Sequence, residues 1–317
     1  MSKRKRIAIT IGDPAGIGPE VVLKTLLSIE VAENCTPVVI GDRTVLAEAV
    51  AALSLPLTLK SIELVECRQI TDPHFEKGKP TAEGGRASVA YIKKAVELAL
   101  KKDVNAIVTA PISKEALKKA GVPWPGHTEM LAELTGTKDF AMMLCGGPLR
   151  VILVTIHAPL KNVPALITRE RVMRTIFLAK RACAMLGIAE PRIAVAGLNP
   201  HAGEVGIFGN EEINEILPAI KEAQKSGISV TGPHPADSLF HKAYKGAFDI
   251  IVSMYHDQGL IPLKMIAFDT GVNVTVGLPI IRTSPDHGTA YDIAWKGIAH
   301  PLSMIEAVKL AMQMRIR

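Results

Sequence analysis

The sequence predicts an α/β protein with mostly parallel β-sheets and two lobes around a cleft. Seven short aliphatic segments bounded by Gly, Pro or Asp have the length of buried strands, and amphipathic segments lie between many of them. Alternating strands and helices favour a parallel sheet with right-handed crossovers. Hydrophobic residues make up 48% of the 317 residues and aromatic residues 4%, which suits aliphatic parallel-sheet cores. Two lobes are expected because single cores stop growing near this chain length.

The expected strands come in the order 6–10, 36–40, 105–109, 151–155, 192–198, 248–254 and 272–276. The clearest helix is expected over 87–100, where apolar residues recur at three- and four-residue spacing: Val89, Ile92, Val96 and Leu100. Another helix should follow the segment GDPAGIGPE, because Pro19 suits a first helical turn and apolar residues follow it.

The formal charge of +6 comes from Lys and Arg scattered along the chain, without basic stripes interleaved with aromatics. Nucleic-acid binding is therefore not expected, and steering of a small anionic substrate explains the excess equally well. The start lacks the apolar core of a secretory signal, and no apolar run is long enough for a membrane span. The cysteines lie far apart without CxxC spacing and are expected to be reduced thiols in a soluble cytoplasmic protein: Cys35, Cys67, Cys145 and Cys183.

The segment Gly12 to Gly18 has three glycines between an expected strand and an expected helix. A helix N-terminus favours a negative group, and glycines allow close backbone approach. The spacing is GxxxGxG, however, so the dinucleotide-binding fingerprint GxGxxG is absent. A tight structural turn and a ligand-binding loop both remain open interpretations.

Three histidines each follow an expected strand: His157 after VILVTI, His201 after IAVAGLNP and His256 after DIIVSMY. Ligands of open α/β sheets bind outside the carboxyl ends of the strands. Three imidazoles that converge there could hold a divalent cation and leave positions open for substrate oxygens. The histidines lie too far apart in sequence for a local metal motif, so ordinary hydrogen-bonded histidines are the alternative.

Polar clusters interrupt aliphatic segments around these histidines, at 199–204 and 255–259, and again at 126–129 and 282–288. Buried polar groups cost stability unless they are used or paired, which favours a functional site. The alternative is helix capping, since Thr128 and Asp286 precede helical patterns.

Seven of these motifs, in order, resemble the PdxA family of 4-hydroxythreonine-4-phosphate dehydrogenases: ITIGDPAGIGPE, GHTEML, LNPHAGE, ADSLF, MYHDQGLIPLK, GVNVTVGLP and IRTSPDHGTAYDIA. The resemblance covers essentially the whole chain. The chain departs from the residues usual in the family at TIHAPL, PHPADSLF and the AWKGIAH segment around Trp295.

The resemblance implies a two-domain subunit like that of isocitrate and isopropylmalate dehydrogenases, with an active-site cleft between the domains. The expected first domain is residues 1–125 with 280–317. Residues 126–279 are expected to form a metal-binding and dimer-forming second domain. The family's metal site is shared between the two subunits of a homodimer.

By the same resemblance, His157, His201 and His256 match the ligands of a divalent metal, with Zn, Mg, Co and Mn all acceptable. The matching substrate-binding positions are His127, Thr128, Lys264, Asn273 and Arg282. NAD or NADP is implied by the resemblance alone, with Asp237 and Gly16 as candidates for cofactor contacts. No catalytic acid or base is assigned.

The implied reaction is the oxidation of 4-phosphooxy-L-threonine to a 3-keto acid that decarboxylates to 3-amino-2-oxopropyl phosphate, a step of pyridoxal 5'-phosphate synthesis. One alternative is a paralogous dehydrogenase of D-threonate or D-erythronate 4-phosphate. Alternatives of another class are a phosphate acetyltransferase-like protein and a non-catalytic phospho-ligand-binding protein.

Overall fold

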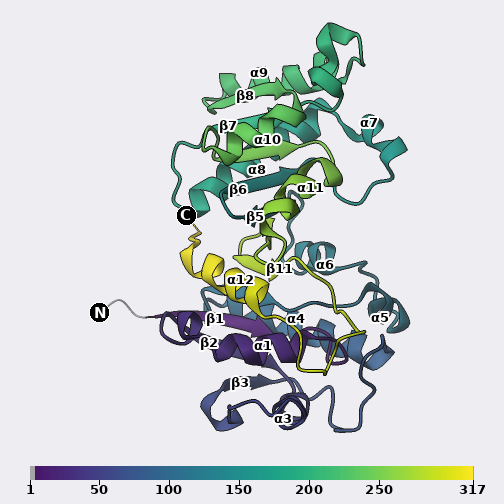
Figure 1. Ribbon diagram of the computed structural model, residues 1–317, viewed down its shortest axis with the longest axis vertical. Coiled ribbons are helices and arrows are strands. Elements are labelled where there is room, and N and C mark those ends of the chain that lie inside the picture. The colour runs from purple at the N-terminus through teal and green to yellow at the C-terminus, as the bar shows by residue number, and fades with distance from the viewer. Residues whose placement is uncertain (1–3, 317) are drawn as a thin grey trace. The chain divides into compact units, whose positions relative to one another are not determined.

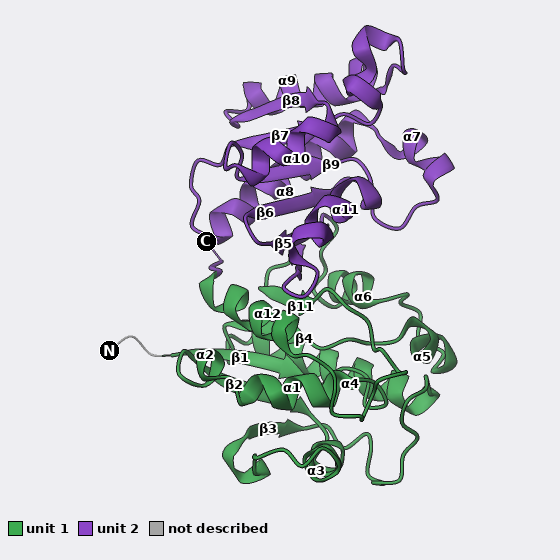
Figure 2. Cartoon of the chain, in the orientation of Figure 1, with its two compact units in different colours: residues 1–138, 278–313 green, residues 139–277, 314–317 purple. Residues whose placement is uncertain are grey.

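The computed structural model describes residues 4–316 and divides the chain into two compact units (Figure 1, Figure 2). Unit 1 contains the residues up to Lys138 together with Leu278–Gln313, and unit 2 contains Asp139–Gly277 together with the residues from Met314. Residues 126–138 belong to unit 1, although they were expected in the second domain. The first three residues of the basic start lie outside the described part of the chain.

Unit 1 alternates strands and helices. Its elements are β1 (Lys5–Thr10), α1 (Gly18–Leu26), α2 (Ile29–Ala32), β2 (Cys35–Gly41), α3 (Arg43–Ala52), η1 (Leu59–Ser61), β3 (Glu63–Glu66), α4 (Ala82–Leu100), β4 (Ala106–Thr109), α5 (Lys114–Lys119), α6 (His127–Leu134), β11 (Arg282–Pro285) and α12 (Leu302–Gln313).

The sheet of unit 1 has the strand order β3-β2-β1-β4-β11, and its four pairings are parallel. Its central strands are buried aliphatic runs, as strands covered on both faces require: Ile7, Ile9, Val38, Val39, Ile107 and Val108 are each 0% exposed. Helix α4 begins with a cap, in which the Thr81 hydroxyl accepts the Gly84 N–H. The parallel order brings the ends of β1, β4 and β11 to one edge of the sheet.

Unit 2 also has helices between most of its strands. Its elements are β5 (Ala141–Gly146), β6 (Leu149–Leu153), η2 (Leu160–Asn162), α7 (Val163–Leu166), α8 (Arg169–Met185), β7 (Ile193–Ala196), η3 (Pro200–Gly206), η4 (Glu212–Ile216, a π-helical turn), α9 (Leu217–Lys225), β8 (Val230–His234), α10 (Ala236–Tyr244), β9 (Ile250–Ser253), α11 (His256–Ala267) and β10 (Val272–Val276).

The sheet of unit 2 has the strand order β10-β5-β6-β9-β7-β8. β10, β5 and β6 pair antiparallel, whereas β6, β9, β7 and β8 pair parallel. Helix α11 packs on this sheet through Leu260 and Leu263, in one cluster with Leu153 and Ile251. The carboxyl ends of β6, β9 and β7 therefore lie side by side at one edge.

All seven expected strands are present, and the predicted α/β class with mostly parallel sheets is confirmed. The helix expected over 87–100 is the C-terminal part of α4, and Pro19 lies in the first turn of α1 as predicted. Four strands were not expected from the sequence: β3, β5, β8 and β11.

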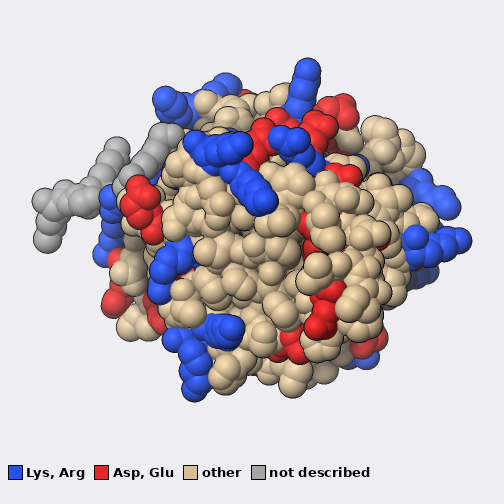
Figure 3. All heavy atoms as spheres, turned by 90° about the horizontal axis from the view of Figure 1, so that it is seen from above, with Lys and Arg blue, Asp and Glu red and all other residues tan. Residues whose placement is uncertain are grey.

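The four cysteines are free in the structure, with Cys35 and Cys183 buried. Between residues 4 and 316, no helix combines the length and the apolar character that crossing a bilayer would demand. On the face shown in Figure 3, Lys and Arg are interspersed with Asp and Glu around a broad uncharged area.

Candidate functional site

Arg282 is a buried cation at the start of β11. It is 2% exposed, and its Nε and Nη2 atoms donate to Thr109 Oγ1 at 3.1 and 2.7 Å. Thr109 is the last residue of β4, so the guanidinium lies at the carboxyl end of that strand. Burial lowers the pKa of Arg282 to about 9. A guanidinium binds carboxylate and phosphate through paired, charge-assisted hydrogen bonds, so Arg282 is a candidate for binding an anionic ligand.

His127 begins α6, in the same unit as Arg282. Its Nε2 atom is buried and has no hydrogen-bond partner among the described residues. Burial, and secondarily the charge of Arg282, holds the pKa of His127 well below its usual value. A neutral imidazole with an unsatisfied buried nitrogen is a group that a ligand can complete.

The capping alternative is wrong for Thr128. Thr128 is the second residue of α6, whose N-cap is Gly126 and has no side-chain cap. Asp286 follows β11 directly, and its N–H donates to Ser303 Oγ in the first turn of α12 at 3.2 Å, so capping stays an alternative for Asp286. Thr128 is therefore placed beside His127 at a helix N-terminus, where backbone N–H groups favour a negative ligand.

The glycines of the loop at 12–18 serve close backbone packing. Gly12 has a φ of +69°, and a Cβ there would lie 2.3 Å from the Pro111 carbonyl oxygen. A Cβ on Gly18 would lie 2.1 Å from the Ile11 carbonyl oxygen. These contacts support the interpretation as a tight structural turn.

The same loop is fastened to the segment after β11. Asp13 is 0% exposed; it accepts the Tyr291 hydroxyl at 2.6 Å and the Ala15 N–H at 2.9 Å, and burial raises its pKa. Trp295 lies in one of the segments that differ from the residues usual in the family, and its Nε1 donates to the Pro14 carbonyl at 3.1 Å. The Trp295 ring also meets Phe75 edge-on at 5.5 Å between centroids. Trp295 is thus part of the packing around the loop at 12–18.

His157 and His256 lie together in unit 2. His157 follows β6 and His256 begins α11 just after the adjacent strand β9, so the sheet brings them to neighbouring positions. Their ring centroids are 5.8 Å apart. His256 Nδ1 and Asp257 Oδ1 are 2.7 Å apart, which leaves Nε2 as the ring nitrogen directed elsewhere. A carboxylate on the second ring nitrogen is the usual partner of a metal-binding histidine.

His201 lies in the exposed turn η3 after β7, with its ring centroid 6.0 Å from that of Phe208. Over residues 4–316, no three side chains of the types His, Cys, Asp and Glu gather closely enough to hold one metal ion. The chain by itself thus brings together two of the three predicted ligands, His157 and His256, and leaves His201 outside that pair.

Lys264 lies on α11, two turns after His256. A shallow groove of about 400 Å³ runs along this helix and is lined by His256, Asp257, Leu260, Ile261, Lys264, Met265 and Phe268. Asn273 lies in β10 of the same unit, and its Oδ1 atom is buried without a hydrogen-bond partner in the described part of the chain. Lys264 and His256 therefore share one surface, and Asn273 carries an unsatisfied acceptor.

The two candidate cofactor residues belong to different units. Gly16 lies in the loop of unit 1, where a Cβ would lie 3.0 Å from Thr289. Asp237 is exposed in the first turn of α10 in unit 2, and its Oδ1 accepts the Ser238 N–H at 2.8 Å. Neither position shows a feature specific to a nucleotide.

Three side chains that support the site were given no role in the sequence analysis, although Gln258 lies in the polar cluster at 255–259. Thr109 holds Arg282, and its signal was a polar residue at the end of an otherwise aliphatic strand. Glu212 accepts backbone N–H groups just before His201. Gln258 accepts the Met254 N–H and donates to the Gly197 carbonyl, both at 2.7 Å, which ties the His256 segment to the end of β7. The last two act across gaps in sequence that no local motif reveals.

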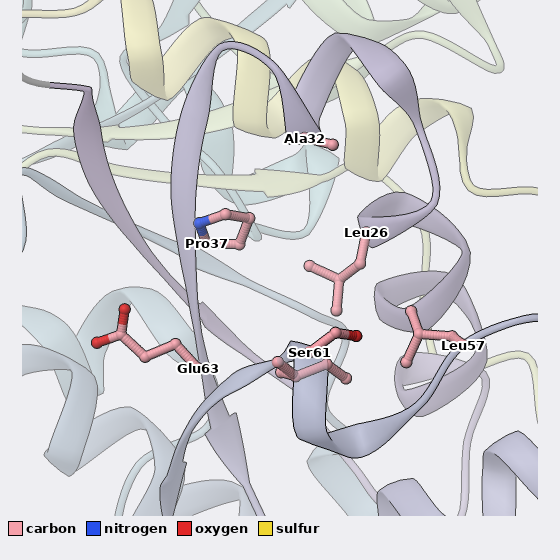
Figure 4. Close-up of a pocket in the computed structure, with 7 residues that line it drawn as sticks. Leu26, Ala32, Pro37, Leu57, Ser61 and Glu63 are labelled. Carbon is pink, nitrogen blue, oxygen red and sulfur yellow. The ribbon is translucent and has the colours of Figure 1, made fainter.

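Another hollow, of about 220 Å³, lies in unit 1 and has a largely apolar lining (Figure 4). Its one charged residue, Glu63, forms a salt bridge with Arg6 at 2.6 Å. None of the predicted site residues lines it. The polar groups at the strand ends are therefore the better candidate site.

Comparison with known proteins gives matches along the whole chain. A profile of the family described as "Pyridoxal phosphate biosynthetic protein PdxA" matches residues 33–311. The 4-hydroxythreonine-4-phosphate dehydrogenase of Trichlorobacter lovleyi is 46% identical, with 98% of each chain covered. A relative from Oceanobacillus iheyensis, provisionally named D-threonate 4-phosphate dehydrogenase, is 47% identical, with 99% of each chain covered.

A solved structure agrees with the sequence relatives. The crystal structure of 4-hydroxythreonine-4-phosphate dehydrogenase from Klebsiella pneumoniae has a TM-score of 0.91 and 42% identity, with 99% of each chain covered. The likeness includes both units, since so little of either chain is left out. The chain belongs to the PdxA family of dehydrogenases.

Proposed function

We propose that the chain oxidises 4-phosphooxy-L-threonine with NAD or NADP, giving a 3-keto acid that loses carbon dioxide to form 3-amino-2-oxopropyl phosphate. This step would belong to pyridoxal 5'-phosphate biosynthesis in the cytoplasm. The observation that carries the proposal is the buried Arg282 beside the neutral His127, a site for an anionic group. The names of relatives that cover nearly the whole chain support it.

The chain's own groups have distinct roles in this proposal. Arg282 and Lys264 supply positive charge for the phosphate and carboxylate of the substrate. His127 and Thr128 add neutral hydrogen-bonding groups at a helix N-terminus. The buried acceptor of Asn273 suits a hydroxyl or ammonium donor. NAD or NADP would take up the hydride, with Gly16 and Asp237 as proposed contacts.

We assign the proposed divalent metal to His157, His201 and His256, with Zn, Mg, Co and Mn as candidates. The His157–His256 pair and the carboxylate on His256 Nδ1 fit an imidazole ligand set. Such an ion would lower the pKa of the substrate hydroxyl and stabilise charge on the oxygen during decarboxylation. Because His201 is outside the pair, the third ligand in this proposal comes from the partner subunit.

Exposed apolar side chains support the proposed homodimer. On α11, Ile261 and Met265 are 60% and 82% exposed, and Phe268 directly after the helix is 74% exposed. Beside His201, Val205 and Ile207 are 94% and 73% exposed. Exposed apolar patches of this kind mark interaction surfaces. In a twofold dimer the patch beside the partner subunit's His201 could cover α11 and bring that imidazole to His157 and His256.

The substrate assay tests the proposed function. Purified protein is mixed with NAD or NADP and with each of three acids: 4-phosphooxy-L-threonine, D-threonate 4-phosphate and D-erythronate 4-phosphate. We expect the highest kcat/KM for 4-phosphooxy-L-threonine, measured by formation of reduced nicotinamide and release of carbon dioxide. The second candidate is D-threonate 4-phosphate, because relatives with that name are as similar to the chain. A higher kcat/KM for D-threonate 4-phosphate overturns the first assignment.

Arg282→Lys is expected to lower kcat/KM by roughly thirtyfold or more, corresponding to about 2 kcal/mol in transition-state binding. The ammonium of lysine cannot keep the bond to Thr109 and also present a planar, bidentate face to an anion. Steady-state kinetics measure the loss. Arg192→Lys is the matched control, because Arg192 pairs with Asp249 on the surface at 2.9 Å. An unchanged kcat/KM in Arg282→Lys removes this residue from the site.

A further inference from the structure

The turn that carries His201 has an unusual backbone. Six consecutive residues, 201–206, have positive φ angles between 41° and 94°, and four of them are not glycine. L-residues other than Gly, Asn and Asp visit this left-handed region rarely, and almost never in runs. Such a run persists only where its surroundings hold it, and it occurs preferentially at functional sites.

The carboxylate of Glu212 is placed to hold this turn. Glu212 is 3% exposed and begins the π-helical turn η4. Its Oε1 accepts the backbone N–H groups of Leu198 and Asn199, both at 2.7 Å. Its Oε2 accepts Asn199 Nδ2 at 2.9 Å. The carboxylate thus fixes two of the three residues that connect β7 to the turn.

The turn also folds closely around this carboxylate. A Cβ on Gly203, in the middle of the left-handed run, would lie 2.7 Å from Glu212 Oε2. A Cβ on Gly197 would lie 3.2 Å from Oε1 and 2.8 Å from the Ala202 Cα. These two glycines leave the space in which the carboxylate contacts both the start and the middle of the turn.

We propose that Glu212 is a positioning residue for His201: its buried carboxylate holds the left-handed turn and so fixes where the imidazole points. This inference rests on the proposed function in one respect, that His201 is a metal ligand. Charge-assisted bonds to backbone N–H groups are among the stronger hydrogen bonds in proteins. Groups that orient a ligand side chain typically change metal affinity tenfold to a hundredfold.

The test compares Glu212→Gln with Glu211→Gln in the full-length protein. Glu211 also accepts Asn199 Nδ2, at 2.7 Å, but it has no bond to the backbone before the turn, so it is the matched control. Zn(II) affinity is measured by competition with a chromogenic chelator. We expect Glu212→Gln to bind Zn(II) about tenfold to a hundredfold more weakly than wild type, and Glu211→Gln to stay within about threefold.

Amide hydrogen exchange of the metal-free protein separates positioning from a general structural role. With positioning, Glu212→Gln accelerates exchange at 197–207 and leaves the strands Ile193–Ala196 and Ile250–Ser253 protected as in wild type. Faster exchange throughout both strands overturns the inference in favour of a role in folding of unit 2. If Glu212→Gln does not fold, Asn199→Ala replaces it, because it removes only the bond to Oε2 and that to Glu211. We expect a severalfold loss of Zn(II) affinity in Asn199→Ala, and an unchanged affinity overturns the inference.

His201→Ala distinguishes failure of the inference from failure of the proposed function. If wild type binds stoichiometric Zn(II), His201→Ala does not, and Glu212→Gln binds as tightly as wild type, only the positioning role is overturned. If His201→Ala binds Zn(II) as tightly as wild type, the proposed ligand set is overturned, and the positioning role with it.

Discussion

His201→Ala is expected to abolish turnover while the protein stays folded. The side chain is exposed in a turn, so its removal takes no apolar contact from the core. The loss removes one of three proposed metal ligands, and the two that remain cannot hold the ion in a chelating geometry. We expect kcat to fall on the order of a thousandfold, equivalent to about 4 kcal/mol of lost transition-state stabilisation.

Circular dichroism and metal content are measured on the same samples as activity. His241→Ala is the control, because His241 is an exposed histidine on α10 that has no proposed role. The control should keep both metal and activity. Full activity with full metal occupancy in His201→Ala contradicts the metal assignment.

The strands that were predicted from the sequence differ in composition from the four that were not. β9 and the last four residues of β1 are buried segments rich in aliphatic residues, IIVS and IAIT, so their burial on both faces is readable from the residues alone. β3 reads ELVE at the sheet edge, and β11 reads RTSP, a polar segment that is nevertheless buried. β5 contains Ala, Met and Cys in place of β-branched residues, and β8 contains a Gly-Pro pair. In these four, tertiary context decides the structure against local propensity.

The candidate site, like the fold, could be predicted only in part from the sequence. That polar residues at strand ends form a site was predictable, because parallel strands bring their carboxyl ends to one edge. The partners of those residues were not. The pairing of His157 with His256 depends on β6 lying next to β9, and His201 lies in a left-handed turn that four non-glycine residues adopt. Neither the strand order nor such a turn leaves a signal in local sequence.

The boundary between unit 1 and unit 2 could also be predicted only in part from the sequence. Residues 126–138 contain α6, and no composition shift or linker separates this helix from what precedes it. Its place in unit 1 puts His127 in the same unit as Arg282 and Thr109. The anionic site proposed from these three residues therefore belongs to a single unit.

Mixed dimers should recover activity from two inactive chains if the metal site is shared. In the proposed arrangement each site takes His157 and His256 from one chain and the partner subunit's His201. When His201→Ala is exchanged with His256→Ala, one site of each mixed dimer receives both defects and the other receives none. Activity is expected at about half the wild-type value per mixed dimer. Exchange is verified independently by mass measurement.

Two further mixtures identify which histidine crosses the interface. His157→Ala with His201→Ala should also recover activity, because these residues are supplied by different chains to each site. The mixture of His157→Ala with His256→Ala should not recover activity. Each site takes both His157 and His256 from one chain, so each of the two sites lacks one ligand. Recovery in this last mixture and in the first, with none in the second, instead means that the partner supplies His256 to a pair formed by His157 and His201. If none of the three mixtures recovers activity although exchange is complete, all three ligands come from one chain, and the shared site is wrong. The 5.8 Å separation of the His157 and His256 rings within a single chain favours recovery in the first two mixtures and none in the third.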